Sequence, residues 1–147
     1  MPNKYEKIDG QPLPIPDKFS DLLERPIVVN LVTVMPDGQP QATPVWADYD
    51  GTYVRVNTAR GRQKDKNMKV GAKVTVLVID PNDDGRWMEI RGQVAVETEE
   101  GAVEHINSLS AKYGGNPDFF ANKEDRRGKE QRVTYKIEPL RINTDGG

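Results

Sequence analysis

The chain has 147 residues, enough for one domain with a single hydrophobic core, and its 21 basic and 23 acidic side chains give a net charge of −2. This balance argues against a protein that mainly coats nucleic acid or anionic membrane, because such proteins usually carry a global basic excess. The absence of cysteine excludes disulfides, thiolate metal sites and a cysteine nucleophile. No apolar run reaches the roughly 18 residues of a spanning helix, and the polar start lacks the apolar centre of a signal peptide, so we expect a cytoplasmic protein.

The N-terminal segment is rich in proline, with Pro at positions 2, 12, 14 and 16. Proline removes a backbone N–H and fixes φ, so residues 1–16 are predicted to form an extended N-terminal arm. Residues 17–147 are predicted to form a single domain. Asp17 is predicted to cap a short helix over residues 18–24, which Pro26 ends.

The segment 27–57 is predicted to form three strands, over residues 27–34, 39–48 and 52–57. The two joints carry the residues that tight turns need. Pro36-Asp37-Gly38 and Asp50-Gly51 supply a preset φ and a glycine that adopts positive φ.

The next elements are a helix and a covered strand. Residues 61–70 have helical composition, and Gly71 is suited to end a helix there. Residues 72–80, "AKVTVLVID", are β-branched and continuously apolar at their centre, which is typical of a strand covered on both faces.

The C-terminal part adds two strands around one longer helix. Residues 87–98 alternate as a strand does, and Gly92 is predicted to mark a bulge or a close backbone approach. Residues 99–113 are predicted to form a helix that ends at Gly114-Gly115. Its apolar stripe is expected to consist of Val103, Ile106, Ser110 and Tyr113. Residues 132–142 form the last strand, after a loop or broken helix.

Consecutive strands with short links indicate an antiparallel meander that closes into a small barrel, so the fold class is mainly β (α+β). The strand, helix and strand over residues 52–80 would also suit a parallel α/β sheet. We rank that second, because the neighbouring links are too short for crossover helices.

The stretch "VNTARGRQKDKNMK", residues 56–69, concentrates positive charge in an acidic chain. Between residues 60 and 69 it holds five basic side chains and one acid, Asp65. A turn between a strand and a helix exposes free helical N–H groups. Arg62, Lys64 and Asn67 would add side-chain donors there, and Arg60 would approach from the turn. This arrangement suits a phosphate, and the alternative is a solvated helix face.

The stretches "MPDGQPQATPVWADYDGTYVRVNTARGRQKDKNM", "AKVTVLVID" and "WMEIRGQVAV" together resemble the pyridoxamine 5′-phosphate oxidase-like split β-barrel superfamily. Within it, the chain is most similar to the deazaflavin (coenzyme F-420)-dependent flavin/deazaflavin oxidoreductases of type B. The resemblance covers residues 17–142. It implies an antiparallel, FMN-binding-like split barrel with short flanking helices, and a homodimer with cofactors in grooves between the subunits.

The resemblance also implies site residues in two groups. The cofactor phosphate and its sugar-alcohol chain would be held by Thr58, Ala59, Arg62, Gln63, Lys64 and Asn67. The tricyclic ring would run along Gln41, Thr43, Pro44, Val45 and Trp46, and Trp87 would reach across the groove from the partner subunit. The leucine usual after the asparagine is Met68 here, a near-isosteric change.

The implied function is hydride transfer between F-420 and a small organic acceptor. FMN-using relatives share the phosphate pocket, so FMN is the alternative cofactor, although Lys66 and Lys69 would suit the anionic F-420 tail. A non-catalytic flavin or deazaflavin carrier and a nucleic-acid binder remain open as other classes, and we expect no nucleic-acid or membrane partner. Because the cofactor carries the hydride, no catalytic side chain and no metal site are expected.

Three other features are left for the structure. Trp46 and Trp87 suit either ring stacking or core packing, and Phe119 either lines a substrate pocket or anchors its loop. His105, the only histidine, lies off the expected apolar stripe, so it is predicted to be exposed and without a role.

Overall fold

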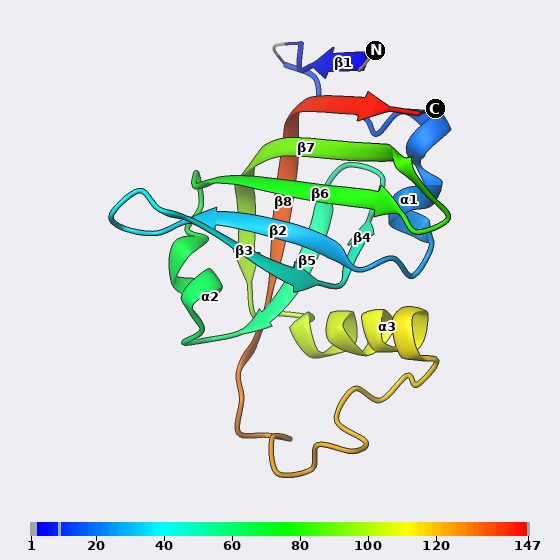
Figure 1. Cartoon of the computed structure of the whole chain (residues 1–147). Coiled ribbons are helices and arrows are strands. Elements are labelled where there is room, and N and C mark those ends of the chain that lie inside the picture. Colours follow the sequence, from blue (N-terminus) through cyan, green and yellow to red (C-terminus); the bar gives the residue numbers. More distant parts are fainter. Residues whose placement is uncertain (1–2, 9, 147) are drawn as a thin grey trace.

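One curled antiparallel sheet dominates the computed structural model, which describes residues 3–8 and 10–146 (Figure 1). Residues 1–2 and 9 of the predicted arm and residue 147 of the predicted domain lie outside the described part. The strand order is β3-β2-β6-β7-β8-β5-β4, and β1 pairs with β8. The strands are β1 (Asn3–Glu6), β2 (Val29–Val34), β3 (Pro40–Val45), β4 (Ala47–Tyr49), β5 (Val54–Ala59), β6 (Lys73–Asp80), β7 (Asp83–Thr98) and β8 (Arg132–Asp145).

The sheet closes because its two edge strands are consecutive in the chain. β3 pairs with β2, and β4 pairs with β5 at the other end of the strand order. Only Trp46 separates them, so the single strand predicted over 39–48 is in fact two strands with a break at Trp46. The predicted antiparallel split barrel is confirmed.

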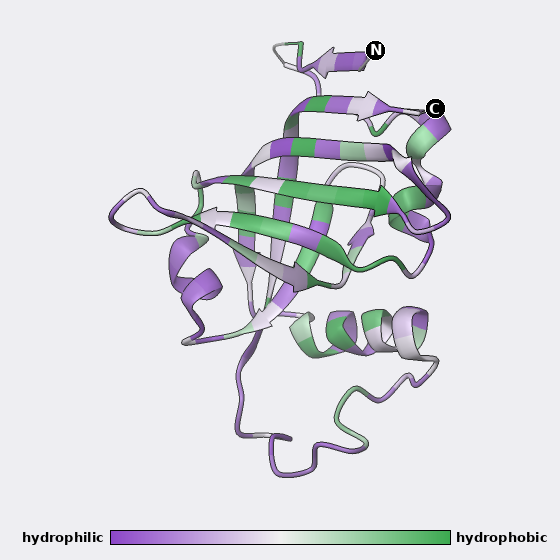
Figure 2. Cartoon of the chain, viewed as in Figure 1, coloured by the Kyte–Doolittle hydropathy of each residue, from purple (hydrophilic) through white to green (hydrophobic). Residues whose placement is uncertain are grey.

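The barrel interior is filled by alternate residues of its strands. Along β2, Val29 and Leu31 are fully buried and Thr33 is 1% exposed, while the residues between them face outward. Figure 2 shows that β2 and β6 carry long apolar stretches, but the prediction that residues 72–80 are covered on both faces was wrong, because buried residues of β6 alternate with half-buried or exposed ones as they do in β2.

The turns follow the predicted chemistry. Gly38 and Gly51 have φ values of 91° and 97°, which L side chains rarely adopt. In the second turn, Asp50 Oδ1 accepts hydrogen bonds from the N–H groups of Thr52 and Tyr53. These contacts set the register of β4 against β5.

Gly92 is a close approach as well as a bulge, as predicted. The pairing of β7 with β8 shifts register between Arg91 and Gly92. A Cβ at Gly92 would lie 2.5 Å from the carbonyl oxygen of Glu138 and 2.8 Å from Cγ2 of Ile137. Only glycine fits this crossing without movement of the backbone.

The helices are shorter than the sequence predicted, and one cap was wrong. The predicted helix over 18–24 is a 3-10 turn, η1 (Asp17–Phe19), followed by α1 (Asp21–Glu24). The Asp17 side chain caps neither, because Pro16 and Ser20 occupy the cap positions. The helix expected over 61–70 is reduced to α2 (Gln63–Asn67).

The longest helix, α3 (Ala102–Gly114), covers one end of the barrel beside β4 and β5 (Figure 1). It ends where predicted, since Gly115 has a φ of 79° and its N–H bonds the carbonyl of Ala111. Its buried face differs from the prediction, because Val103 is 45% exposed. The face that packs consists of Ala102, His105, Ile106, Leu109 and Ser110.

The described N-terminal residues contact the barrel at two places. β1 pairs with the end of β8, and Leu13 and Ile15 belong to the core. Over the described ranges 3–8 and 10–146, the helices are too short or too polar to cross a membrane.

Candidate functional site

A groove of about 330 Å³ lies where the corner between β3 and β4 meets α3, the start of α2 and the start of β8. One side of it is apolar and the other carries three cationic side chains. Its lining residues are Val28, Pro44, Val45, Trp46, Asn57, Arg62, Lys64, Ile106, Leu109, Phe119 and Arg132.

The cationic side consists of Arg62, Lys64 and Arg132. Over the described residues, neither Arg62 nor Lys64 forms an ion pair with a carboxylate, while Arg132 contacts Glu130 at 2.6 Å. Burial lowers the pKa of Lys64, and the positive charges of Arg62 and Arg132 lower it further. The fold therefore holds two uncompensated cations beside each other, an arrangement that favours an anionic ligand.

Arg60 belongs to the same basic stretch but has a different role. The sequence placed it at the anion site, and the structure directs it to three carboxylates instead: Asp65 at 2.9 Å, Glu97 at 3.2 Å and Glu99 at 2.9 Å. Arg60 is thus neutralised within the fold and does not line the groove.

Asp65, the single acid of the basic stretch, is an anchor for the turn before α2. It is 5% exposed and accepts hydrogen bonds from the N–H of Gly61 at 2.9 Å, from Arg60 and from the Tyr135 hydroxyl. Burial alone would raise the pKa of Asp65, but the hydrogen bonds from Tyr135, Gly61 and Arg60 hold it below the ordinary value. Because Asp65 is occupied by Arg60, it leaves Arg62 and Lys64 without a counter-ion.

The apolar side is built around Trp46, which the break between β3 and β4 turns toward α3. Its ring stacks on Tyr113 with centroids 5.3 Å apart and a 13° angle between the planes. Phe119, from the loop after α3, meets Trp46 edge-on at 6.2 Å. Phe119 therefore lines the groove and also anchors its loop, which answers the question that the sequence left open.

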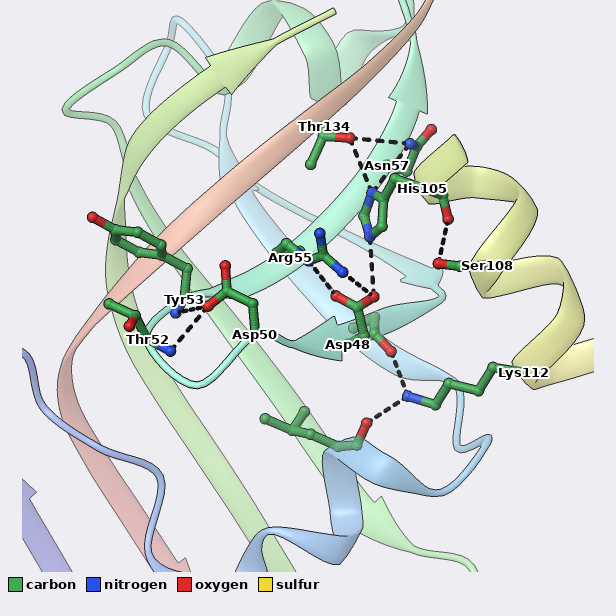
Figure 3. A network of polar contacts seen from close by, with 12 residues as sticks. Asp48, Asp50, Thr52, Tyr53, Arg55, Asn57, His105, Ser108, Lys112 and Thr134 are labelled. Atoms are coloured by element: carbon green, nitrogen blue, oxygen red, sulfur yellow. Dashed lines mark hydrogen bonds and ion pairs between the residues drawn. The ribbon is translucent and has the colours of Figure 1, made fainter. Parts of the chain in front are cut away.

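His105 is buried, so the prediction that it is exposed was wrong. It is 5% exposed and lies on the packed face of α3. The sequence interpretation placed Val103 on the buried stripe, whereas Ala102 occupies that face and brings His105 with it. Figure 3 shows the ring between Asp48 of β4 and Thr134 of β8, with Asn57 of β5 beside it.

The predicted site residues fall into three groups. Pro44, Val45, Trp46, Arg62 and Lys64 line the groove together. The next group lies on the same elements without lining it and consists of Gln41, Thr43, Thr58, Ala59, Gln63 and Asn67. Trp87 lies apart, on β7.

Two members of the second group lie in strand β5 rather than in the expected turn. Thr58 is 1% exposed, and its hydroxyl has no hydrogen-bond partner in the described structure. Ala59 is also buried. On α2, Gln63 donates to Asn67 at 2.8 Å, and Asn67 donates to Thr33 of β2 at 3.0 Å, which ties the helix to the barrel.

Trp87 lines a second, apolar hollow of about 470 Å³ on the outer face of the sheet. Ile79 is its cross-strand partner and is 40% exposed. The other residues of this hollow are Val32, Thr75, Leu77 and Glu89. The single chain therefore does not bring Trp87 to the groove.

Sequence reasoning missed Val28, Asn57, Ile106, Leu109 and Arg132 as lining residues. Asn57 and Arg132 are polar side chains whose burial is visible only in the structure. Such a residue is rarely buried unless it is paired or functional.

The chain belongs to the pyridoxamine 5′-phosphate oxidase family, whose model matches residues 15–144. Its structure is similar to that of an F420 reductase, with 32% identity, a TM-score of 0.73, and coverage of 87% of this chain and 98% of that chain. No curated protein sequence matches the chain. The barrel is thus the flavin-binding split barrel of an oxidoreductase family.

More distant structures share the fold. One is a conserved hypothetical protein from Mycobacterium tuberculosis, with 23% identity, a TM-score of 0.70, and coverage of 95% of this chain and 89% of that chain. Another is an FAD and haem binding protein from Mycobacterium smegmatis, with 16% identity, a TM-score of 0.61, and coverage of 90% and 72%.

Proposed function

We propose that the protein is a cytoplasmic oxidoreductase that transfers a hydride between the F-420 deazaflavin and a small organic acceptor, with the cofactor bound at a homodimer groove. The observation that carries the proposal is the pair of uncompensated cations, Arg62 and Lys64, beside an apolar and aromatic groove wall. The similarity to an F420 reductase supports it.

The donor set fits the anionic part of such a cofactor. Arg62 and Lys64 offer charged N–H donors to a phosphate, and Arg132 adds a guanidinium that is 3% exposed. Because α2 has only five residues, these side chains rather than the helix N-terminus supply most of the attraction. The N–H of Gly61 is already bonded to Asp65 and is not available to a ligand.

The apolar wall fits the tricyclic ring. Pro44, Val45 and Trp46 follow one another along the groove, and Thr43 and Gln41 precede them on β3. β3 is an edge strand, so its outer backbone groups are free to bond the polar rim of the ring. Thr58, Ala59, Gln63 and Asn67 would then support the phosphate-binding turn from within the fold.

When bound, the reduced deazaflavin supplies the hydride from its central ring. The chain's own residues would hold the anionic end, orient the ring against Trp46 and keep water from the apolar side. Hydride donation needs no side-chain nucleophile, so this role requires no catalytic dyad on the groove wall.

The homodimer would complete the site. The outer hollow around Trp87 and Ile79 is apolar on an exposed sheet face, and a second copy would cover it. Ile79→Lys should then shift the protein from dimer to monomer in sedimentation velocity and weaken cofactor binding. A cofactor-competent monomer of the unaltered chain would contradict the shared groove.

FMN is the second candidate, and one observation favours it. The groove presents only two uncompensated cations, which match the single compact phosphate of FMN. Lys66 and Lys69 are exposed outside the groove, where only the longer anionic tail of F-420 would meet them.

The test identifies the bound cofactor and then measures whether the protein transfers hydride from it to an acceptor. The chromophore released by denaturing the purified protein is compared with authentic F-420 and FMN by absorbance and mass, and the emptied protein is titrated with both. Reduced F-420 is then mixed with the loaded protein and a panel of conjugated acceptors. Tight F-420 binding with acceptor-dependent oxidation supports the proposal, binding without oxidation indicates a carrier, and preference for FMN supports the second candidate.

A further inference from the structure

A buried imidazole lies one side chain away from the cationic side of the groove, and the proposed function gives it no task. Nε2 of His105 lies 3.2 Å from Asp48 Oδ2, and Nδ1 lies 3.0 Å from Thr134 Oγ1 (Figure 3). Asn57, which lines the groove, places its amide nitrogen 3.3 Å from the same Nδ1.

The neighbours of His105 determine which ring nitrogen carries the proton. The carboxylate of Asp48 can only accept, which favours the proton on Nε2, and the neutral ring then offers Nδ1 as an acceptor to the amide of Asn57 and the hydroxyl of Thr134. Nε2 faces the carboxylate of Asp48 at 3.2 Å, and the two groups attract each other electrostatically.

Asp48 is held ionised and in place. Arg55 donates two hydrogen bonds of 2.8 Å to it, from Nε and Nη2. Burial alone would raise the pKa of Asp48, but the contacts with His105 and Arg55 hold it below the ordinary value. A fixed negative charge therefore favours the tautomer of His105 that leaves Nδ1 free to accept.

Asn57 transmits this constraint to the groove. Its Nδ2 donates to the Ala102 carbonyl at 2.9 Å and faces His105, so Oδ1 points the other way and accepts from Arg132 Nε at 2.9 Å. Rotating the amide by 180° would set two donors against each other at Arg132, and two acceptors against each other both at the Ala102 carbonyl and at Nδ1 of His105. In a buried position such contacts are costly, so the amide has one stable orientation.

Arg132 is thereby fixed on three sides. Nε bonds Asn57, Nη1 bonds Glu130 at 2.6 Å, and the guanidinium lies over the Phe119 ring with 5.0 Å to its centroid. Nη2 makes no hydrogen bond to any residue in the described part of the chain, which leaves it for a ligand in the groove that Arg132 lines.

We propose that His105 is a positioning residue for the anion-binding side of the groove. Asp48 sets the tautomer of His105, the unprotonated Nδ1 fixes the amide of Asn57, and that amide orients Arg132 toward the bound anion. The inference rests on the proposed function for the ligand, F-420 or FMN, whereas the three contacts belong to the protein alone.

Two substitutions of His105 separate this role from simple space filling. Asparagine places a carboxamide oxygen near the position of Nδ1 and keeps an acceptor for Asn57. Glutamine places its amide nearer the position of Nε2 and keeps a partner for Asp48 while losing that acceptor. A residue that only fills space should make the two variants alike. Glu104→Gln, on the exposed neighbouring residue of α3, is the matched control.

The experiment has two readouts on the full chain. The dissociation constants of F-420 and FMN are measured for the parent and the three variants. The hydrogen exchange of the Arg132 Nε–H is followed by NMR without ligand, with the signal assigned through Arg132→Lys. We expect His105→Gln to weaken binding roughly tenfold and to speed the Nε–H exchange by a similar factor, because one oriented, charge-assisted contact is lost. His105→Asn and Glu104→Gln should stay within about threefold of the parent on both readouts.

The two readouts distinguish the two proposals. If the parent binds neither cofactor but the exchange still differs between glutamine and asparagine, the proposed function fails and the positioning role stands. If both cofactors bind and the two variants behave alike in both readouts, the positioning role is overturned. Should His105→Gln not fold, Asn57→Ser removes the link itself, and parent-like exchange of Arg132 Nε–H in that variant would refute the proposal.

Discussion

Replacing the basic residues of the stretch 56–69 by glutamine, one at a time, should distinguish an arginine that stabilises the fold from the cations that bind the ligand. Arg60, Arg62 and Lys64 are nearly adjacent in sequence, and each loses its charge on replacement by glutamine. Arg60 contacts three carboxylates, whereas Arg62 and Lys64 contact none in the described ranges. The same chemical change should therefore have opposite consequences for stability and for binding.

The magnitudes follow from these contacts. Arg60→Gln leaves Asp65, whose side chain is 6% exposed, without one charged donor, so the free energy of unfolding should fall by about 1–3 kcal/mol. Arg62→Gln and Lys64→Gln should each weaken cofactor binding by about 1.5–3 kcal/mol, or roughly tenfold to somewhat above a hundredfold. Neither substitution should lower the free energy of unfolding. Arg62 is exposed and has no carboxylate partner among the described residues, and burial lowers the pKa of Lys64, so the fold disfavours the Lys64 charge.

The assay pairs urea unfolding with cofactor titration on the same three variants. Arg60→Gln should shift the unfolding midpoint and keep parent-like affinity in the folded range, and the other two should do the reverse. The reasoning is refuted if Arg60→Gln is the variant that loses affinity, or if Arg62→Gln and Lys64→Gln bind F-420 and FMN like the parent. In the second case the basic stretch is only a solvated face.

Three further predictions each concern a single residue. Cofactor affinity should fall as pH rises through the lowered pKa of Lys64, which lies below the ordinary 10.5, and Lys64→Arg should make affinity less dependent on pH. Because Lys64 binds its proton more tightly in the unfolded chain than in the folded one, the free energy of unfolding should rise with pH over the same range. Lys69→Ala should weaken binding less than Lys64→Gln, and only for long-tailed F-420 at low salt, as titration at two salt concentrations would show. Gly92→Ala should cost about 1–3 kcal/mol in a denaturation experiment, because its Cβ would lie 2.5 Å from the Glu138 carbonyl; an unchanged midpoint would show that β7 and β8 separate easily.

Much of the barrel was predictable because its signals are local. Alternation, β-branched runs and turn residues placed the strands from β2 to β8 within a few residues of their observed bounds, whereas β1 lies in the segment predicted only as an extended arm. The break at Trp46 could not be predicted, because it depends on how the sheet curls. The chain has to leave its pairing with β2 at the end of β3 so that β4 can pair with β5. No residue in the neighbourhood of Trp46 encodes that long-range constraint.

The prediction of which face of α3 is buried was wrong for a related reason. Val103 is more hydrophobic than Ala102, so a pattern based on hydropathy selects it, and His105 then falls on the outer face. In the structure Ala102 is 1% exposed and Val103 faces solvent. A small residue fits close against β5, where the Ala102 carbonyl accepts from Asn57, and this contact decides the rotation of the helix.

The convergence of Asn57 and Arg132 could not be seen from sequence, because 75 residues separate them and only the pairing of β5 with β8 brings them together. Their contact is one of several polar contacts in the groove wall, while Arg62 and Lys64 line the groove without a carboxylate partner among the described residues. A chain with a net charge of −2 has carboxylates enough to neutralise both cations, as it neutralises Arg60. The fold instead leaves them without an ion pair to any described acid, and burial lowers the pKa of Lys64. Such an arrangement reduces stability unless an anion completes it, and that is the physical reason to regard the groove as a binding site rather than a gap between elements.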